Sequence, residues 1–263
     1  MSLLSALSAP SRERPRLETR AWLRTVGRPG PESWVWPVAA TGWALLVWGG
    51  FGWYPLGEAS MGGHHHAQHP ADDAGFADAA GVHLLLWAAM VAATMLPLIA
   101  RNLRVVGLRS PRERRTRATL DVAAGWALVW LAAGVVVLAA LAAAAVVPRV
   151  VAVGVVCATA VAWQFTPIRR VALARCHRTF APPLGATAGV ACARFGTSLG
   201  RDCLLTCWPS MVLMTVAGHQ LVVVAALAWL SWRDLRRPHD RPGIGVSVAV
   251  LVAAAVFAAL VQP

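Results

Sequence analysis

The sequence places a dense group of potential metal ligands between residues 61 and 73. This segment reads Met-Gly-Gly-His-His-His-Ala-Gln-His-Pro-Ala-Asp-Asp. Its imidazoles and carboxylates belong to His64, His65, His66, His69, Asp72 and Asp73. Neutral imidazole suits copper, zinc and nickel, and a His-rich tract is a recognised metal-binding composition. The spacing differs from that of a closed structural zinc site, so we predict a loop that captures metal with fast exchange. The alternative is a loop that is simply hydrophilic.

Sulfur ligands form a second group, on two apolar segments. Apart from the initiator, the methionines are Met61, Met90, Met95, Met211 and Met214. Cys203, Cys207 and Met211 are spaced four residues apart and Met214 follows three later, so a helix would place them along one stripe. Thiolate and thioether together favour Cu(I). The alternative is that these residues only pack the two helices.

The two groups form a gradient of ligand softness. If the apolar segments cross a membrane, the loop histidines lie outside it, and His83 and His219 lie at its outer boundary. The methionine thioethers then lie at mid-depth, and the cysteine thiols lie near the cytoplasmic end. The direction in which the Met95 side chain points depends on how far Pro97 distorts this turn of the helix. We therefore predict copper that is captured outside and held as Cu(I). The predicted metal ligands are His64, His65, His66, His69, His83, Met90, Met95, Cys203, Cys207, Met211, Met214 and His219.

The elements that must position these residues are apolar segments long enough to cross a bilayer, for which about twenty residues suffice. Only 14% of the 263 residues are charged, against about a quarter in soluble domains. The predicted spans are 34–53, 81–100, 120–147, 150–165, two within 203–232 divided at Gly218-His219, and 244–261. We expect an all-α polytopic membrane bundle of about seven transmembrane helices.

Arginine distribution gives the orientation. All 24 basic residues are arginines, and in the seven-span reading every one except Arg149 faces the cytoplasm. Joining 203–232 into one helix would move the last four arginines outside. We expect an N-terminal cytoplasmic tail (1–33), a transmembrane domain (34–263) with an external loop (55–80), an external C-terminus, and a bacterial plasma membrane location. The polar start is unlike a cleavable signal peptide.

Several other functions are disfavoured. The net charge of +12 resides in short runs between apolar segments, so we expect no nucleic-acid partner. The sequence has no Gly-rich phosphate loop and no hydrolase or metalloprotease motif. Asp121 and Asp202 are expected to cap helix N-termini. None of the five cysteines falls in an external loop, so we expect free thiols.

Three motifs resemble one family. Trp87-Ala-Ala-Met90 with Met95-Leu-Pro97, Gln164–Arg170 with Cys176, and Gly200–Cys203 with Cys207-Trp208 and Met211 are similar to the domain-of-unknown-function 2182 family of predicted metal-binding membrane proteins, often labelled copper chaperone. The resemblance covers roughly residues 80–237. It implies a polytopic helical bundle with a copper role.

The chain also departs from that family pattern. Ala172 and Thr206 stand where the family has cysteines, and the acidic-basic pair after the sixth span is altered near residues 231–233. Our first hypothesis is a copper-binding protein that stores the metal or delivers it to a membrane cuproenzyme. The second is an accessory subunit of a membrane oxidase or monooxygenase complex. An enzyme in its own right is the third and least favoured.

Overall fold

The computed structural model describes residues 30–50, 73–178, 180, 183, 185, 187–236 and 243–261. Within these ranges the chain forms nine α-helices, two short 3-10 helices and no strand, so the predicted all-α class is confirmed for this part. The helices are α2 (Val35–Gly50), α3 (Asp73–Thr94), η2 (Leu96–Ile99), α4 (Ala100–Arg109), η3 (Arg112–Arg114), α5 (Arg115–Ala143), α6 (Arg149–Gln164), α7 (Pro167–Cys176), α8 (Ala188–Val216), α9 (Leu221–Arg236) and α10 (Gly243–Leu260).

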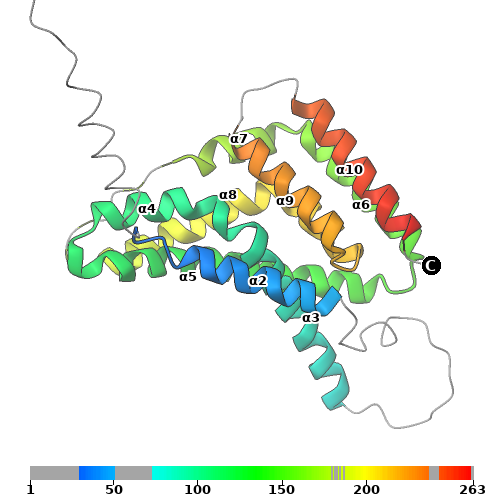
Figure 1. Cartoon of the computed structure of the whole chain (residues 1–263), viewed down its shortest axis with the longest axis horizontal. Helices are drawn as coiled ribbons and strands as arrows, with labels where there is room; N and C mark the ends of the chain where they lie inside the picture. Colours follow the sequence, from blue (N-terminus) through cyan, green and yellow to red (C-terminus); the bar gives the residue numbers. More distant parts are fainter. Residues whose placement is uncertain are drawn as a thin grey trace, which may run out of the picture.

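The two longest helices, α5 and α8, pack closely against each other (Figure 1). α3 and α4 pack on α5, and α6, α7 and α9 pack on α8, whereas α2 lies on α3 and α10 lies against α6 and α9. Two glycines make the close approach of α5 and α8 possible. A Cβ atom at Gly125 would overlap the backbone carbonyl of Ala193, and one at Gly196 would overlap that of Val122. Small residues at such crossings are the usual means by which membrane helices come close.

A bend at Met95 separates α3 from the η2–α4 segment. Pro97 occupies the first turn of η2 and has no backbone N–H to donate, so the α-helix gives way to a 3-10 turn. The two segments are inclined at 41° to each other. The predicted distortion at Pro97 is therefore confirmed, and it leaves the Met95 side chain fully buried in the core.

A second break lies between α8 and α9, where the sequence predicts it. Gly218 and His219 both adopt the left-handed conformation, with φ angles of 70° and 57°. Their N–H groups donate to the carbonyls of Thr215 and Met214, each at 2.9 Å, which caps the C-terminus of α8. The chain then reverses into α9, and the predicted division of 203–232 is confirmed.

Length and composition support fewer membrane spans than the seven predicted from hydropathy. In the described part, one helical unit, Arg112–Ala143, is long and apolar enough to cross a membrane. Two further candidates are bent pairs, α3 with η2–α4 and α6 with α7, the latter inclined at 72°. The helices α2, α6 and α9 have only 16 residues each, fewer than the roughly twenty that span a bilayer core. The all-helical class stands, and the seven-span topology is not established.

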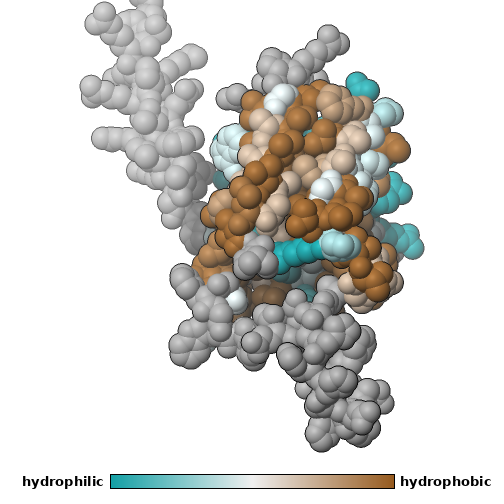
Figure 2. Space-filling view, turned by 90° about the vertical axis from the view of Figure 1, so that its right-hand side faces the viewer, coloured by the Kyte–Doolittle hydropathy of each residue, from teal (hydrophilic) through white to brown (hydrophobic). Residues whose placement is uncertain are grey.

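Much of the described surface is apolar. Figure 2 shows a largely hydrophobic face on the side where α6 and α10 lie. Val150 of α6 is 65% exposed, and Leu128 and Val136 of α5 are 64% and 68% exposed. Soluble monomers rarely expose large contiguous apolar areas, and such areas mark contact with lipid or with other proteins.

The predicted helix caps at Asp121 and Asp202 are wrong. α5 begins at Arg115 and α8 begins at Ala188, so both carboxylates lie inside a helix. Asp202 is 3% exposed, in the middle of α8. Hydropathy marks where an apolar stretch starts, whereas α8 continues for several turns on the N-terminal side of that point.

Candidate metal site

Three sulfur atoms gather where α8 passes the bend at Met95. Cys203 and Cys207 lie one turn apart on α8 and are 6% and 7% exposed. The Cys207 Sγ lies 3.6 Å from the Met95 Sδ and 3.1 Å from the Cys203 carbonyl oxygen. The thiols of Cys203 and Cys207, one helical turn apart, also interact with each other. We call Met95, Cys203 and Cys207 the sulfur cluster.

The chemistry of this cluster fits a soft metal ion. Two ligands that each bind one ion at about 2.3 Å, the usual zinc–sulfur distance, lie at most about 4.6 Å apart. The Cys207–Met95 sulfur separation of 3.6 Å is within that limit. Two thiols and a thioether form a donor set that favours Cu(I). The residues present therefore fit copper.

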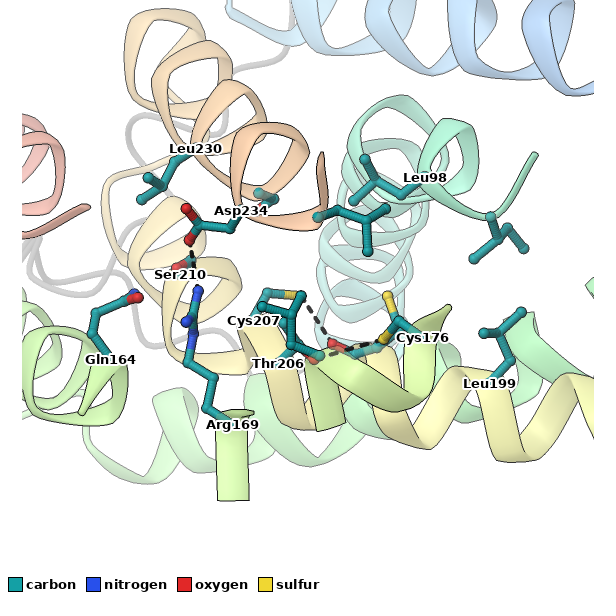
Figure 3. Close-up of a pocket in the computed structure, with 15 residues that line it drawn as sticks. Leu98, Gln164, Arg169, Cys176, Leu199, Thr206, Cys207, Ser210, Leu230 and Asp234 are labelled. Carbon is teal, nitrogen blue, oxygen red and sulfur yellow. Dashed lines mark hydrogen bonds and ion pairs between the residues drawn. The ribbon is translucent and has the colours of Figure 1, made fainter. Parts of the chain in front are cut away.

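A small cavity of about 40 Å³ adjoins the cluster, between α7, α8, α9 and η2 (Figure 3). Cys203 and Cys207 line it together with Cys176, the C-terminal residue of α7. The Cys176 Sγ lies 3.7 Å from the Thr206 hydroxyl. A cavity needs about 10–15 Å³ to hold one water molecule. The space beside the cluster can therefore admit water or a small ion, with a third thiol nearby.

A buried ion pair closes the other side of this cavity. The Arg169 guanidinium donates to Asp234 at 2.6 Å, and both side chains are 10% exposed. Arg233 also donates to Asp234, at 3.1 Å, and to the Ser247 hydroxyl of α10. Figure 3 shows Arg169 and Asp234 meeting across the cavity from α7 and α9. This network joins α7, α9 and α10, and it holds two arginines against one carboxylate.

Tryptophans of α3 and α5 pack beside Cys203. The indoles of Trp126 and Trp130 interact with the sulfur of Cys203. Trp87 of α3 donates its N–H to the Trp130 carbonyl at 2.9 Å. A Cβ atom at Gly134 would overlap the Trp87 ring, so this glycine admits the indole against α5.

Pro209 lies inside α8, one half-turn beyond Cys207. Because proline has no N–H, it leaves the carbonyl of Leu205, four residues earlier, without its helical donor. The indole of Trp163 donates to that carbonyl at 2.8 Å. The carbonyl that Pro209 frees is thus already bonded.

Two histidines lie near the opposite end of α8. His219 lies in the turn after α8, and His83 lies exposed on α3 and interacts with it electrostatically. Burial, and secondly the charge of His83, lower the pKa of His219 to about 4. The His219 imidazole is therefore neutral at pH 7, the form that binds metals. Its Nε2 is buried and has no hydrogen-bond partner in the described part of the chain.

The structure brings only some of the predicted ligands together. Met90, Met211 and Met214 are fully buried in the main hydrophobic core. The loop histidines His64, His65, His66 and His69 lie outside the described residues. Within the described ranges, no three His, Cys, Asp or Glu side chains gather closely enough to hold a metal ion. The sulfur cluster meets the requirement for three ligands only because a methionine takes part.

Sequence reasoning did not include several residues that the structure places at this site. They are Trp126, Trp130, Arg169, Cys176, Thr206 and Asp234. For Cys176 and Arg169 a signal existed, because both belong to one of the three motifs. The two tryptophans and the ion pair reach the site through contacts between distant helices, which no local spacing reveals.

Comparison with known families gives a match to the family described as copper chaperone (PpoB2), over residues 84–259. Comparison with curated proteins and with solved structures gives no significant match. The matched region contains the sulfur cluster, the cavity and the ion pair, and it covers more than half of the chain. It supports a copper-related function. The chain therefore belongs to the copper chaperone family.

Proposed function

We propose that this protein is an integral membrane copper-binding protein. It captures copper at the external histidine loop and holds Cu(I) at the sulfur cluster, for storage or for delivery to a membrane cuproenzyme. The observation that carries the proposal is the buried contact between the sulfurs of Met95 and Cys207, 3.6 Å apart and beside Cys203, in a chain of the copper chaperone family.

The proposed route follows α8. Copper enters near His83 and His219, passes Met90, Met211 and Met214, and reaches the cluster. Ligands change along this route from imidazole to thioether to thiolate, an order of increasing preference for Cu(I). The buried, neutral imidazole of His219 supports the entry step.

The membrane location is part of the same proposal. The exposed apolar side chains of α2, α5, α6 and α10 suit hydrocarbon better than water. A reporter fused to each chain end should show the N-terminus in the cytoplasm and the C-terminus outside. Two ends on the same side would contradict the seven-span topology.

Metal content of the purified protein tests the copper site. The four loop histidines are first changed to alanine, so that only buried copper is counted. The detergent-solubilised protein is then loaded with Cu(I) under reducing conditions and measured by elemental analysis, beside two variants. Cys203→Ala/Cys207→Ala should lose the copper, whereas Cys157→Ala/Cys192→Ala should keep it, since neither thiol lines the cavity.

Stoichiometric copper that depends on Cys203 and Cys207 supports the proposal. No copper in the parent protein would overturn it and favour an accessory subunit without a working metal site. Equal copper in both double variants would place the metal elsewhere and would also contradict the sulfur cluster.

A further inference from the structure

Two buried indole N–H groups beside Cys203 have no ordinary hydrogen-bond partner. Trp126 and Trp130 are 3% and 1% exposed. Their Nε1 atoms are fully buried and make no well-oriented hydrogen bond to any described residue. Both indoles lie on the face of α5 that meets α8 next to Cys203, because a Cβ atom at Gly200, three residues before Cys203, would contact the Trp126 backbone at 3.0 Å. Both indoles interact with the Cys203 sulfur. A buried donor left unpaired costs about 1–3 kcal/mol, so two of them beside one atom call for an explanation.

The surrounding packing holds both indoles in this place. Trp126 and Trp130 are four residues apart on α5 and so share one face, with ring centroids 6.2 Å apart. Trp87 packs on Trp130 at 6.3 Å and hydrogen-bonds to its carbonyl. Because α5 and α8 cross closely, this face of α5 packs against the part of α8 that carries Cys203.

We infer that Trp126 and Trp130 are positioning residues that donate their indole N–H groups to the Cys203 sulfur when it holds Cu(I). A neutral thiol is a weak acceptor. When Cu(I) binds, a Cys203–S–Cu bond forms, the thiol proton leaves to solvent and the sulfur becomes a strong acceptor. The two N–H groups thus gain their partner only in the loaded state. This inference rests on the proposed function and explains what makes the site hold copper.

The expected effect is tighter binding of copper. Removing a hydrogen-bond partner from a metal ligand typically lowers metal affinity 10–100-fold. The test uses Trp126→Phe and Trp130→Phe, singly and together, in the protein that lacks the loop histidines. Phenylalanine keeps an aromatic ring and lacks the N–H. Cu(I) affinity is measured by competition with a chromophoric chelator.

A spectroscopic readout separates this role from simple packing. Hydrogen bonds lower the energy of the sulfur lone pairs, so their loss should move the cuprous-thiolate charge-transfer band to longer wavelength. Trp163→Phe is the control, because its N–H donates to the Leu205 carbonyl rather than to sulfur. Replacing Trp126 or Trp130 by benzothienylalanine, which exchanges N–H for S, keeps the indole shape if phenylalanine prevents folding.

A 10–100-fold loss of affinity with a red-shifted band in the Trp126 and Trp130 variants, and no shift in the control, supports the inference. Unchanged affinity and band, in variants that bind copper as the parent does, would overturn the inference and leave the proposed function intact. A parent protein that binds no copper would overturn both.

Discussion

Replacing Met95 by leucine tests whether its thioether is a copper ligand. The two side chains have similar volumes, so the exchange in a fully buried site should cost less than about 1.5 kcal/mol of folding free energy. The copper site, in contrast, should lose one of three sulfurs. The Met95 Sδ lies 3.6 Å from the Cys207 Sγ, within the limit of about 4.6 Å for two ligands of one ion.

The loss of affinity should exceed the 10–100-fold that removal of an outer partner costs, because a direct ligand is lost. Chelator competition under reducing conditions measures the dissociation constant of Met95→Leu in the protein without loop histidines. Leu103→Met makes the reverse exchange at another fully buried position and should leave the affinity unchanged. Wild-type affinity in Met95→Leu would refute the assignment of this thioether.

Two further substitutions, each paired with a control substitution, test the helix packing and the ion pair. Gly196→Ala should destabilise the protein by about 1–3 kcal/mol or more, because the added Cβ would overlap the Val122 carbonyl. Gly154→Ala is the control: its Cβ would meet nothing within 4 Å, so it should stabilise α6 by up to about 1 kcal/mol. Asp234→Asn should cost about 3–5 kcal/mol, since it removes the carboxylate partner of the buried Arg169 guanidinium. Glu32→Gln breaks a pair whose arginine is 55% exposed and should cost at most about 1 kcal/mol. Unfolding in detergent measures the stability of all four variants. Equal effects of the two glycine substitutions would contradict the close packing of α5 and α8, and equal effects of the two carboxylate substitutions would contradict the burial of the Arg169–Asp234 pair.

Local chemical rules predicted the fold best where glycine or proline governs the backbone. The break at Gly218-His219 and the distortion at Pro97 both follow from missing side-chain or N–H atoms, and both are present. The start of α8 could not be predicted in this way. Its first turns contain three glycines (Gly189, Gly196 and Gly200), which argue against a helix, and two arginines (Arg194 and Arg201), which argue against an apolar span. They are helical where Gly196 and Gly200 pack against α5.

The candidate site was predictable only in part. Regular spacing placed Cys203 and Cys207 together on one helix, and the bend brought Met95 to them. The ion pair between Arg169 and Asp234 joins residues 65 positions apart, and such a pairing depends on how α7 and α9 fold together. No helical periodicity contains that information.

Copper X-ray absorption spectroscopy of the Cu(I)-loaded protein without loop histidines tests the central claim most directly. The account predicts a first shell made of sulfur alone, at about 2.3 Å as for thiolate ligands of zinc. It also predicts loss of that shell in Cys203→Ala/Cys207→Ala. A first shell of nitrogen or oxygen, or a sulfur shell that survives the double substitution, would contradict it.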